Sequence, residues 1–190
     1  MSQHAVIRRW LKVADPTAIT ARETLQRALQ FGRRVEDVER SELFCVVWDT
    51  PQQGAEAMLE GLAVETTLIS NPNKHRVEVA VGGDAVHPRG NVWVLVWEPG
   101  DGAGLEAAVR RLGLLAEPPA RIRQAVLWEL ALDGSPAEVA DRAREIAVAR
   151  SRTSGLLANL QYQRAEVFTR PPTASQIVSR VTAPETTEVA

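Results

Sequence analysis

The chain has 190 residues, a net charge of −2, 45% hydrophobic and 24% charged residues, a composition typical of a folded protein with one large or two small domains. A net charge this close to zero argues against nonspecific binding to nucleic acid, because proteins of that class carry a clear excess of positive charge. The single cysteine, Cys45, excludes an intramolecular disulfide and a metal centre built from cysteines. It lies in the apolar run "LFCVVW", where we expect it to be a small buried residue.

The first half of the chain predicts alternating strands and helices. The expected elements are a strand over 6–13, a helix over 20–31, two strands over 35–40 and 43–48 that form a hairpin, a helix over 55–69 and a strand over 77–81. The helices follow from apolar residues spaced three and four apart, and the last strand from the alternation of valine with charged residues. Gly32 suits the end of the first helix, and Asn71-Pro72 is expected to end the second.

The second half repeats this order after the Gly- and Pro-rich stretch "GGDAVHPRG", which predicts a linker. The expected elements are a strand over 92–97, a helix over 105–112, two short strands or one bent strand within 122–132, a helix that starts at Ser135-Pro136 and a strand over 164–168. Gly113 suits the end of the first of these helices. Asn159 is expected to close the helical region, as Asn71 does in the first half.

The two halves share residues at matching places, which predicts an internal duplication. Gly32 corresponds to Gly113, Asp49 to Asp133 and Asn71 to Asn159, and both halves end in Arg-x-Glu-Val. The offsets of about 81, 84 and 88 residues fit a duplicated small domain better than a solenoid repeat. We therefore expect a first repeat over 1–82, a linker over 83–90, a second repeat over 91–168 and a flexible C-terminal tail over 169–190. Ile177, Val178 and Val181 are the tail residues expected to dock, if any do.

The predicted order β-α-β-β-α-β is that of a ferredoxin-like unit, with a four-stranded antiparallel sheet and both helices on one face. The expected fold class is α+β, with two tandem units. Each sheet would leave one face bare, and the strand "VWVLVW" is apolar on both faces. We therefore expect the two units to pack or join as a pseudo-twofold pair.

The first half resembles the PurS family, the small subunit of bacterial phosphoribosylformylglycinamidine synthase. The stretches that carry the resemblance are "ADPTAITARETLQRALQFG", "VEDVERSELFCVVWD" and "ISNPNKHRVEV". The second half lacks Asp-Pro but keeps "AAVRRLG", "RIRQAVLWELALD" and "LLANLQYQRAEV", so the resemblance covers 5–168 in two passes. Typical members are half as long and have Pro where this chain has Leu160. The residues carried over as a structural or interface motif are Asp15, Pro16, Gly32, Asn71, Pro72, Gly113 and Asn159.

The resemblance implies a noncatalytic subunit that bridges the glutaminase and the ATP-dependent synthetase of this amidotransferase. The family works as a dimer, so a tandem chain is expected to be an intramolecular pseudo-dimer or to form a homo-oligomer. Two other functions stay open: a small-molecule regulatory protein of the ACT type, which binds ligands between paired units, and a scaffold protein that kept the fold and changed partner.

The residues themselves predict no catalytic centre, cofactor or metal site. The glycine-rich "GDGAG" lacks the Lys of a phosphate-binding loop, and the three histidines lack ligand-like spacing with carboxylates. No apolar run reaches the ~18 residues of a membrane span, and the first residues do not read as a secretory signal. We expect a cytoplasmic protein with no membrane or nucleic-acid partner.

Overall fold

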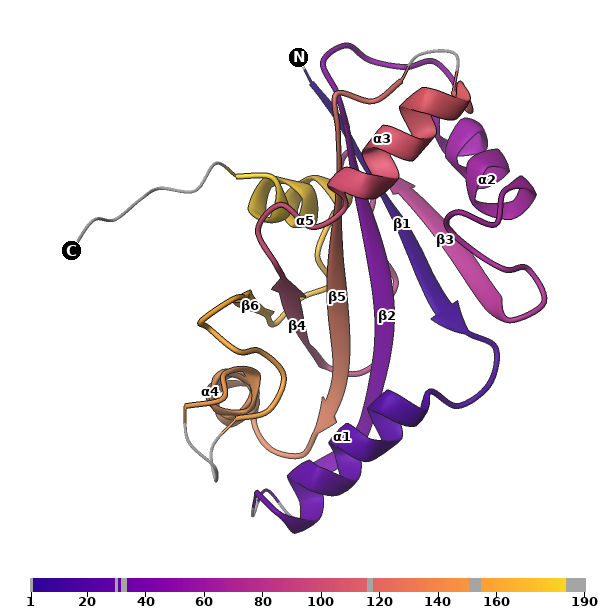
Figure 1. Ribbon diagram of the computed structural model, residues 1–190. Helices are drawn as coiled ribbons and strands as arrows, with labels where there is room; N and C mark the ends of the chain where they lie inside the picture. Colours follow the sequence, from indigo (N-terminus) through magenta and orange to yellow (C-terminus); the bar gives the residue numbers. More distant parts are fainter. Residues whose placement is uncertain (1, 30, 32–33, 116–117, 151–154, 184–190) are drawn as a thin grey trace.

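The computed structural model describes residues 2–29, 31, 34–115, 118–150 and 155–183, and these form one six-stranded antiparallel sheet with five helices (Figure 1). The elements are β1 Gln3–Leu11, α1 Pro16–Arg27, β2 Val35–Trp48, α2 Ala55–Glu65, β3 His75–Val81, β4 Val92–Trp97, α3 Ala103–Leu112, β5 Arg121–Leu132, α4 Pro136–Ala147, β6 Arg164–Phe168 and α5 Ala174–Val181. The α+β class expected from the sequence is confirmed.

The strand order is β3-β1-β2-β5-β4-β6, and every neighbouring pair is antiparallel. The first half supplies β1 to β3 and the second half β4 to β6, so the order of the second half mirrors that of the first. The long central strands β2 and β5 pair with each other and join the halves into a single sheet (Figure 1).

The hairpin expected over 35–48 is instead one continuous strand of 14 residues. Ser41 and Glu42, which suggested a turn, pair with Leu127 and Val126 of β5 in the ladder. No Gly, Asn or Pro stands there to supply a tight turn. The second half likewise has one strand, β5, over 121–132, so each half contributes three strands rather than four.

Four helices cover one face of the sheet in two groups. Helices α1 and α4 bury Leu25 and Ile146 in one core with residues of β2, β4 and β5, and α2 buries Leu59 against β1 and β2, with Val109 of α3 in the same core. Helix α1 of the first half therefore shares a hydrophobic core with α4 of the second half. The face that they cover is the one to which Phe44 and Trp128 belong.

The opposite face is covered at its centre by α5, where the sequence predicted a flexible tail. Ile177, Val178 and Val181 are buried there against residues of β1, β2, β4 and β5. Thr173 caps the helix, because its hydroxyl accepts a hydrogen bond from the Gln176 backbone at 3.2 Å. The tail residues 184–190 lie outside the described residues.

Cys45 lies under α5 and is fully buried, as its apolar surroundings predicted. Burial raises the pKa of its thiol, because the low-dielectric interior disfavours the thiolate. Cys45 therefore acts as a packing residue. None of the helices that the structure describes has the length and apolar character needed to cross a lipid bilayer.

Candidate functional site

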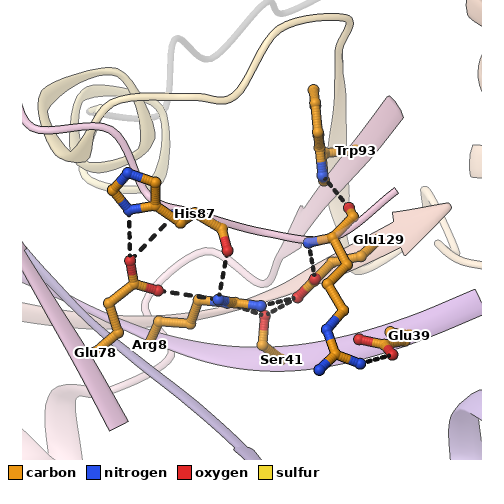
Figure 2. A network of polar contacts seen from close by, with 8 residues as sticks. Arg8, Glu39, Ser41, Glu78, His87, Trp93 and Glu129 are labelled. Carbon is orange, nitrogen blue, oxygen red and sulfur yellow. Dashed lines mark hydrogen bonds and ion pairs between the residues drawn. The ribbon is translucent and has the colours of Figure 1, made fainter. Parts of the chain in front are cut away.

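A buried ion-pair cluster joins the two halves on the face that carries α5 (Figure 2). The Arg8 cluster consists of Arg8 from β1, Ser41 from β2, Glu78 from β3 and Glu129 from β5. The Arg8 guanidinium donates to Glu129 at 2.7 Å, to Glu78 at 2.9 Å and to the Ser41 hydroxyl at 3.1 Å. Arg8 is only 5% exposed and Glu129 2%, so the central pair is withdrawn from water.

The linker between the halves is fastened to this cluster through its backbone. Arg8 donates to the His87 carbonyl at 3.0 Å, and the Arg89 amide donates to Glu129 at 2.6 Å. His87 Nδ1 also lies 2.9 Å from a Glu78 carboxylate oxygen (Figure 2). Gly90 follows with a φ of +81° and runs so close to β5 that an added Cβ would lie 2.4 Å from the Leu130 carbonyl oxygen. The linker is thus an ordered part of the molecule.

The charges of the cluster are fully engaged. Glu129 accepts from Arg8, Ser41 and the Arg89 amide through its two oxygens. Desolvation acts to raise the pKa of Glu78, but the hydrogen bonds from His87 and Arg8 outweigh it and hold that pKa below its usual value. No buried side-chain polar atom of the described residues lacks a partner. The cluster therefore holds the two halves and the linker together, a role that we call the lock, and it contains no carboxylate without a hydrogen-bond partner.

The strand ladders define which residues of the two halves are equivalent. In β1 the residue opposite Arg76 of β3 is Trp10, and in β4 the residue opposite Arg164 of β6 is Trp97. Matching Trp10 to Trp97 gives an offset of about 87 residues between β1 and β4. The pairing of β1 with β2 and that of β4 with β5 then give an offset of about 84 residues between β2 and β5. These are close to the offsets of 84 and 88 between the paired Asp and Asn residues of the sequence.

By this register, the residues equivalent to Arg8, Ser41 and Glu129 are Leu95, Ala125 and Cys45, and all three are apolar and buried under α5. The lock is therefore present once, at one of two equivalent places. Sequence reasoning missed it. Its signal was a charged residue inside each of the apolar runs "AVIRRW" and "VLWELAL".

Asn71 and Asn159 form the same turn in the two halves. The side-chain oxygen of Asn71 accepts from the Asn73 amide at 2.9 Å, and its own amide donates to His75 Nδ1 at 2.9 Å. Asn159 repeats both contacts with the residues at the same spacing. Its partners are the Gln161 amide at 3.0 Å and the Gln163 side chain at 3.0 Å. Neither Asn ends a helix, because α2 and α4 stop at Glu65 and Ala147, so both residues build the turn that leads into a strand.

The other motif residues have local roles at helix ends. Asp15 caps α1 by accepting from the Thr17 amide at 2.8 Å, Pro16 takes the first position of that helix, and Arg40 lies 3.5 Å from Asp15. Gly113 ends α3 in the left-handed conformation with a φ of 60°. Gly32 lies outside the described residues. The structure does not gather the motif into one place, since the two Asn turns lie at opposite ends of the sheet.

Among the described residues there is no group of three or more His, Cys, Asp or Glu side chains that could hold a metal ion. Neither a scan against protein-family models nor a search of the curated proteins found a match for this chain.

Proposed function

We propose that the chain is a duplicated, single-chain relative of the PurS family that works as an assembly subunit between a glutaminase and an ATP-dependent synthetase. Each half would then be a ferredoxin-like unit whose second and third strands have merged into one long strand, β2 or β5. The pair of halves would be the intramolecular form of a dimer. Purine biosynthesis and a cytoplasmic location are part of the same proposal.

The observation that carries the proposal is the repeated turn at Asn71 and Asn159. Each Asn makes the same two hydrogen bonds, one through its side-chain oxygen and one through its backbone amide, and each is followed by an edge strand that contains Arg-x-Glu-Val. The mirrored strand order and the common ladder offsets support duplication at the level of the whole sheet. The motifs "ADPTAIT" and "ISNPN" connect the first half to the family.

A role in assembly is also supported by the way the polar residues are used. The charged groups of the Arg8 cluster bind one another and the linker, all within the chain. The turn at Asn159, by contrast, presents apolar side chains to solvent, with Leu160 48% and Tyr162 65% exposed. The equivalent turn of the first half has Pro72 and Lys74, both exposed, at the matching positions. We propose that the Asn159 turn contacts a partner subunit.

The test is reconstitution with the glutaminase and synthetase subunits from the same organism. The tagged chain should retain both subunits on a column, and glutamine-dependent amidation should require all three proteins. Replacing Leu160 and Tyr162 with Ser should abolish retention without lowering the melting temperature. The matched control replaces Pro72 and Lys74 with Ser in the other half and should retain both subunits.

Failure of the unmodified chain to bind either subunit, together with amidation that proceeds without it, would falsify the assembly role. Equal retention by the two double variants would instead reject the Asn159 turn as the contact and leave the assembly role to be judged by the unmodified chain.

A further inference from the structure

A cavity of about 550 Å³ lies at the end of the sheet where β4 finishes. Four arginines and Trp97 line it, and none of the described residues that line it is acidic. The arginines are Arg121, Arg123, Arg164 and Arg180. A hollow of this size accommodates a small molecule of the mononucleotide class. Its charge is unusual for a chain whose net charge is −2.

Two of the four guanidiniums are neutralised by neighbours and two are not. Arg123 pairs with Glu106 at 3.0 Å, and Arg180 pairs with Glu166 at 2.8 Å. Arg121 donates to the Thr182 carbonyl at 2.9 Å, and Arg164 makes a long contact of 3.4 Å with the Gln163 carbonyl. Among the described residues, neither Arg121 nor Arg164 has a carboxylate partner. Both are exposed, so their remaining N–H donors face solvent.

The equivalent cavity of the first half differs because acidic as well as basic residues line it. That cavity, of about 390 Å³, lies beside Trp10 and Arg76, the register equivalents of Trp97 and Arg164. At the β2 positions that match Arg121 and Arg123 it has Asp37 and Glu39. Asp37 pairs with Arg22 at 3.2 Å and Glu39 with Arg89 at 2.6 Å, so two cations of this cavity are neutralised by acids that line the cavity itself. Its other cations are Lys12, Arg40 and Arg76, and Arg40 lies 3.5 Å from Asp15.

We propose that the cavity beside Trp97 binds a small phosphate-bearing molecule, with Arg121 and Arg164 as the principal phosphate ligands. Guanidinium groups present paired donors that match phosphate oxygens, and a charge-assisted bond is about twice as strong as a neutral one. Trp97 offers an aromatic surface on which a ring of the same ligand can stack. This binding does not depend on the proposed assembly role, because the cavity is formed within one chain.

The experiment is titration calorimetry of the purified full-length chain with ADP, pyrophosphate and adenosine at low salt. ADP and pyrophosphate should bind at one site per chain, and adenosine should not bind. Arg121→Gln and Arg164→Gln should each weaken ADP binding at least about tenfold, the effect of losing one charge-assisted bond. Arg76→Gln is the matched control at the other end of the sheet and should leave ADP binding unchanged.

Three outcomes overturn the proposal: no heat from either phosphate compound at millimolar concentration, adenosine binding as tightly as ADP, or equal weakening by Arg76→Gln. The three arginines are exposed, so unfolding of the variants is not expected. Circular dichroism melts of the same samples check that each variant keeps the fold.

Discussion

Two patches on one face of the sheet occupy equivalent positions and are built in opposite ways. One consists of Arg8, Ser41 and Glu129, and the other of Leu95, Ala125 and Cys45. The polar patch is covered by the linker and the apolar patch by α5.

The covering segment explains the difference between the two patches. A helix satisfies its own backbone hydrogen bonds and needs only an apolar surface beneath it. The linker is irregular, so its amides and carbonyls require partners. Arg8 bonds the His87 carbonyl, and Glu129 accepts from the Arg89 amide. Charged side chains in the sheet therefore take the place of the hydrogen bonds that an irregular cover cannot make for itself.

The strongest test of this comparison is to remove one charge from the polar patch. Glu129→Ala leaves the Arg8 guanidinium buried with Glu78 as its remaining carboxylate, and breaking a buried pair in this way costs about 3–5 kcal/mol. Urea unfolding measures the loss. The triple variant Arg8→Leu, Ser41→Ala, Glu129→Cys copies the apolar patch but leaves the His87 carbonyl and the Arg89 amide of the linker without their partners, so it should stay less stable than the unmodified chain. A loss below about 1 kcal/mol for Glu129→Ala would contradict the assignment of the cluster as a lock.

The apolar patch is tested by changing α5, the helix that covers it. Ile177 of α5 is fully buried, and Ile177→Ala should reduce the free energy of unfolding by about 2–5 kcal/mol, because it removes buried methyl groups and leaves a cavity. Ser179→Ala, at an exposed position of the same helix, is the control and should change little. If the two variants have the same free energy of unfolding, α5 does not cover the sheet in solution, and the apolar patch has no covering helix.

The two Asn turns give a smaller and more symmetrical comparison. Asn159→Ala removes the bond from the Gln161 amide and should cost about 0.5–1.5 kcal/mol, the net worth of one hydrogen bond. Asn71→Ala removes the equivalent bond but should cost less, because Pro72 already restricts the backbone of its turn. Thermal unfolding of the two single variants gives the ranking. A larger loss for Asn71→Ala would show that the two turns are not equivalent.

The smallest expected effect is a difference between the two turns in how the stability that they provide depends on pH. Burial, and then the charges of Arg9 and Lys74, lower the pKa of His75 below its ordinary value of 6.5. The unfolded chain therefore takes up a proton before the folded one, so stability present at neutral pH is lost as the pH falls through 6.5. Gln163 holds the equivalent position and does not titrate.

His75→Gln should accordingly flatten the pH dependence of the melting temperature between pH 7.5 and 5.5, while Gln163→His should steepen it. An identical slope for the unmodified chain and His75→Gln would show that another group sets the acid response.

Local patterns in the sequence located most of the elements, because apolar spacing and turn residues act over a few positions. Gly113 ends a helix as expected. Helix α1 covers Pro16–Arg27, so it begins and ends four residues before the helix expected over 20–31. The turn expected at Ser41-Glu42 is absent because a long-range contact explains the polar residue. The Ser41 hydroxyl donates a hydrogen bond to Glu129, which lies 88 positions later in the chain, and the strand does not turn there. Helix α5 was missed in the same way, since its apolar residues show their role only when the bare face of the sheet is known.

The site was harder to predict than the fold. Arg8 and Glu129 lie 121 positions apart, and no spacing rule connects two single charges at such a distance. The Asn turns, by contrast, were visible from the sequence because two similar segments, "LISNPNKHRVEV" and "LLANLQYQRAEVF", contain them. Their chemistry was misplaced, however: each Asn bonds the residues that follow it and begins a strand, whereas a helix end was expected.

The pairing of β2 with β5 has a consequence for what each half could do alone. A first half expressed by itself would expose β2, a strand of 14 residues, as an unprotected edge that invites a second copy. In such a homodimer the position of Glu129 would be taken by the copy's Cys45, and Arg8 would lose its central carboxylate. Because the two halves lie in one chain, their sequences can differ. One of the two equivalent patches can therefore bind the linker while the other packs against α5, which two identical copies of one half could not do.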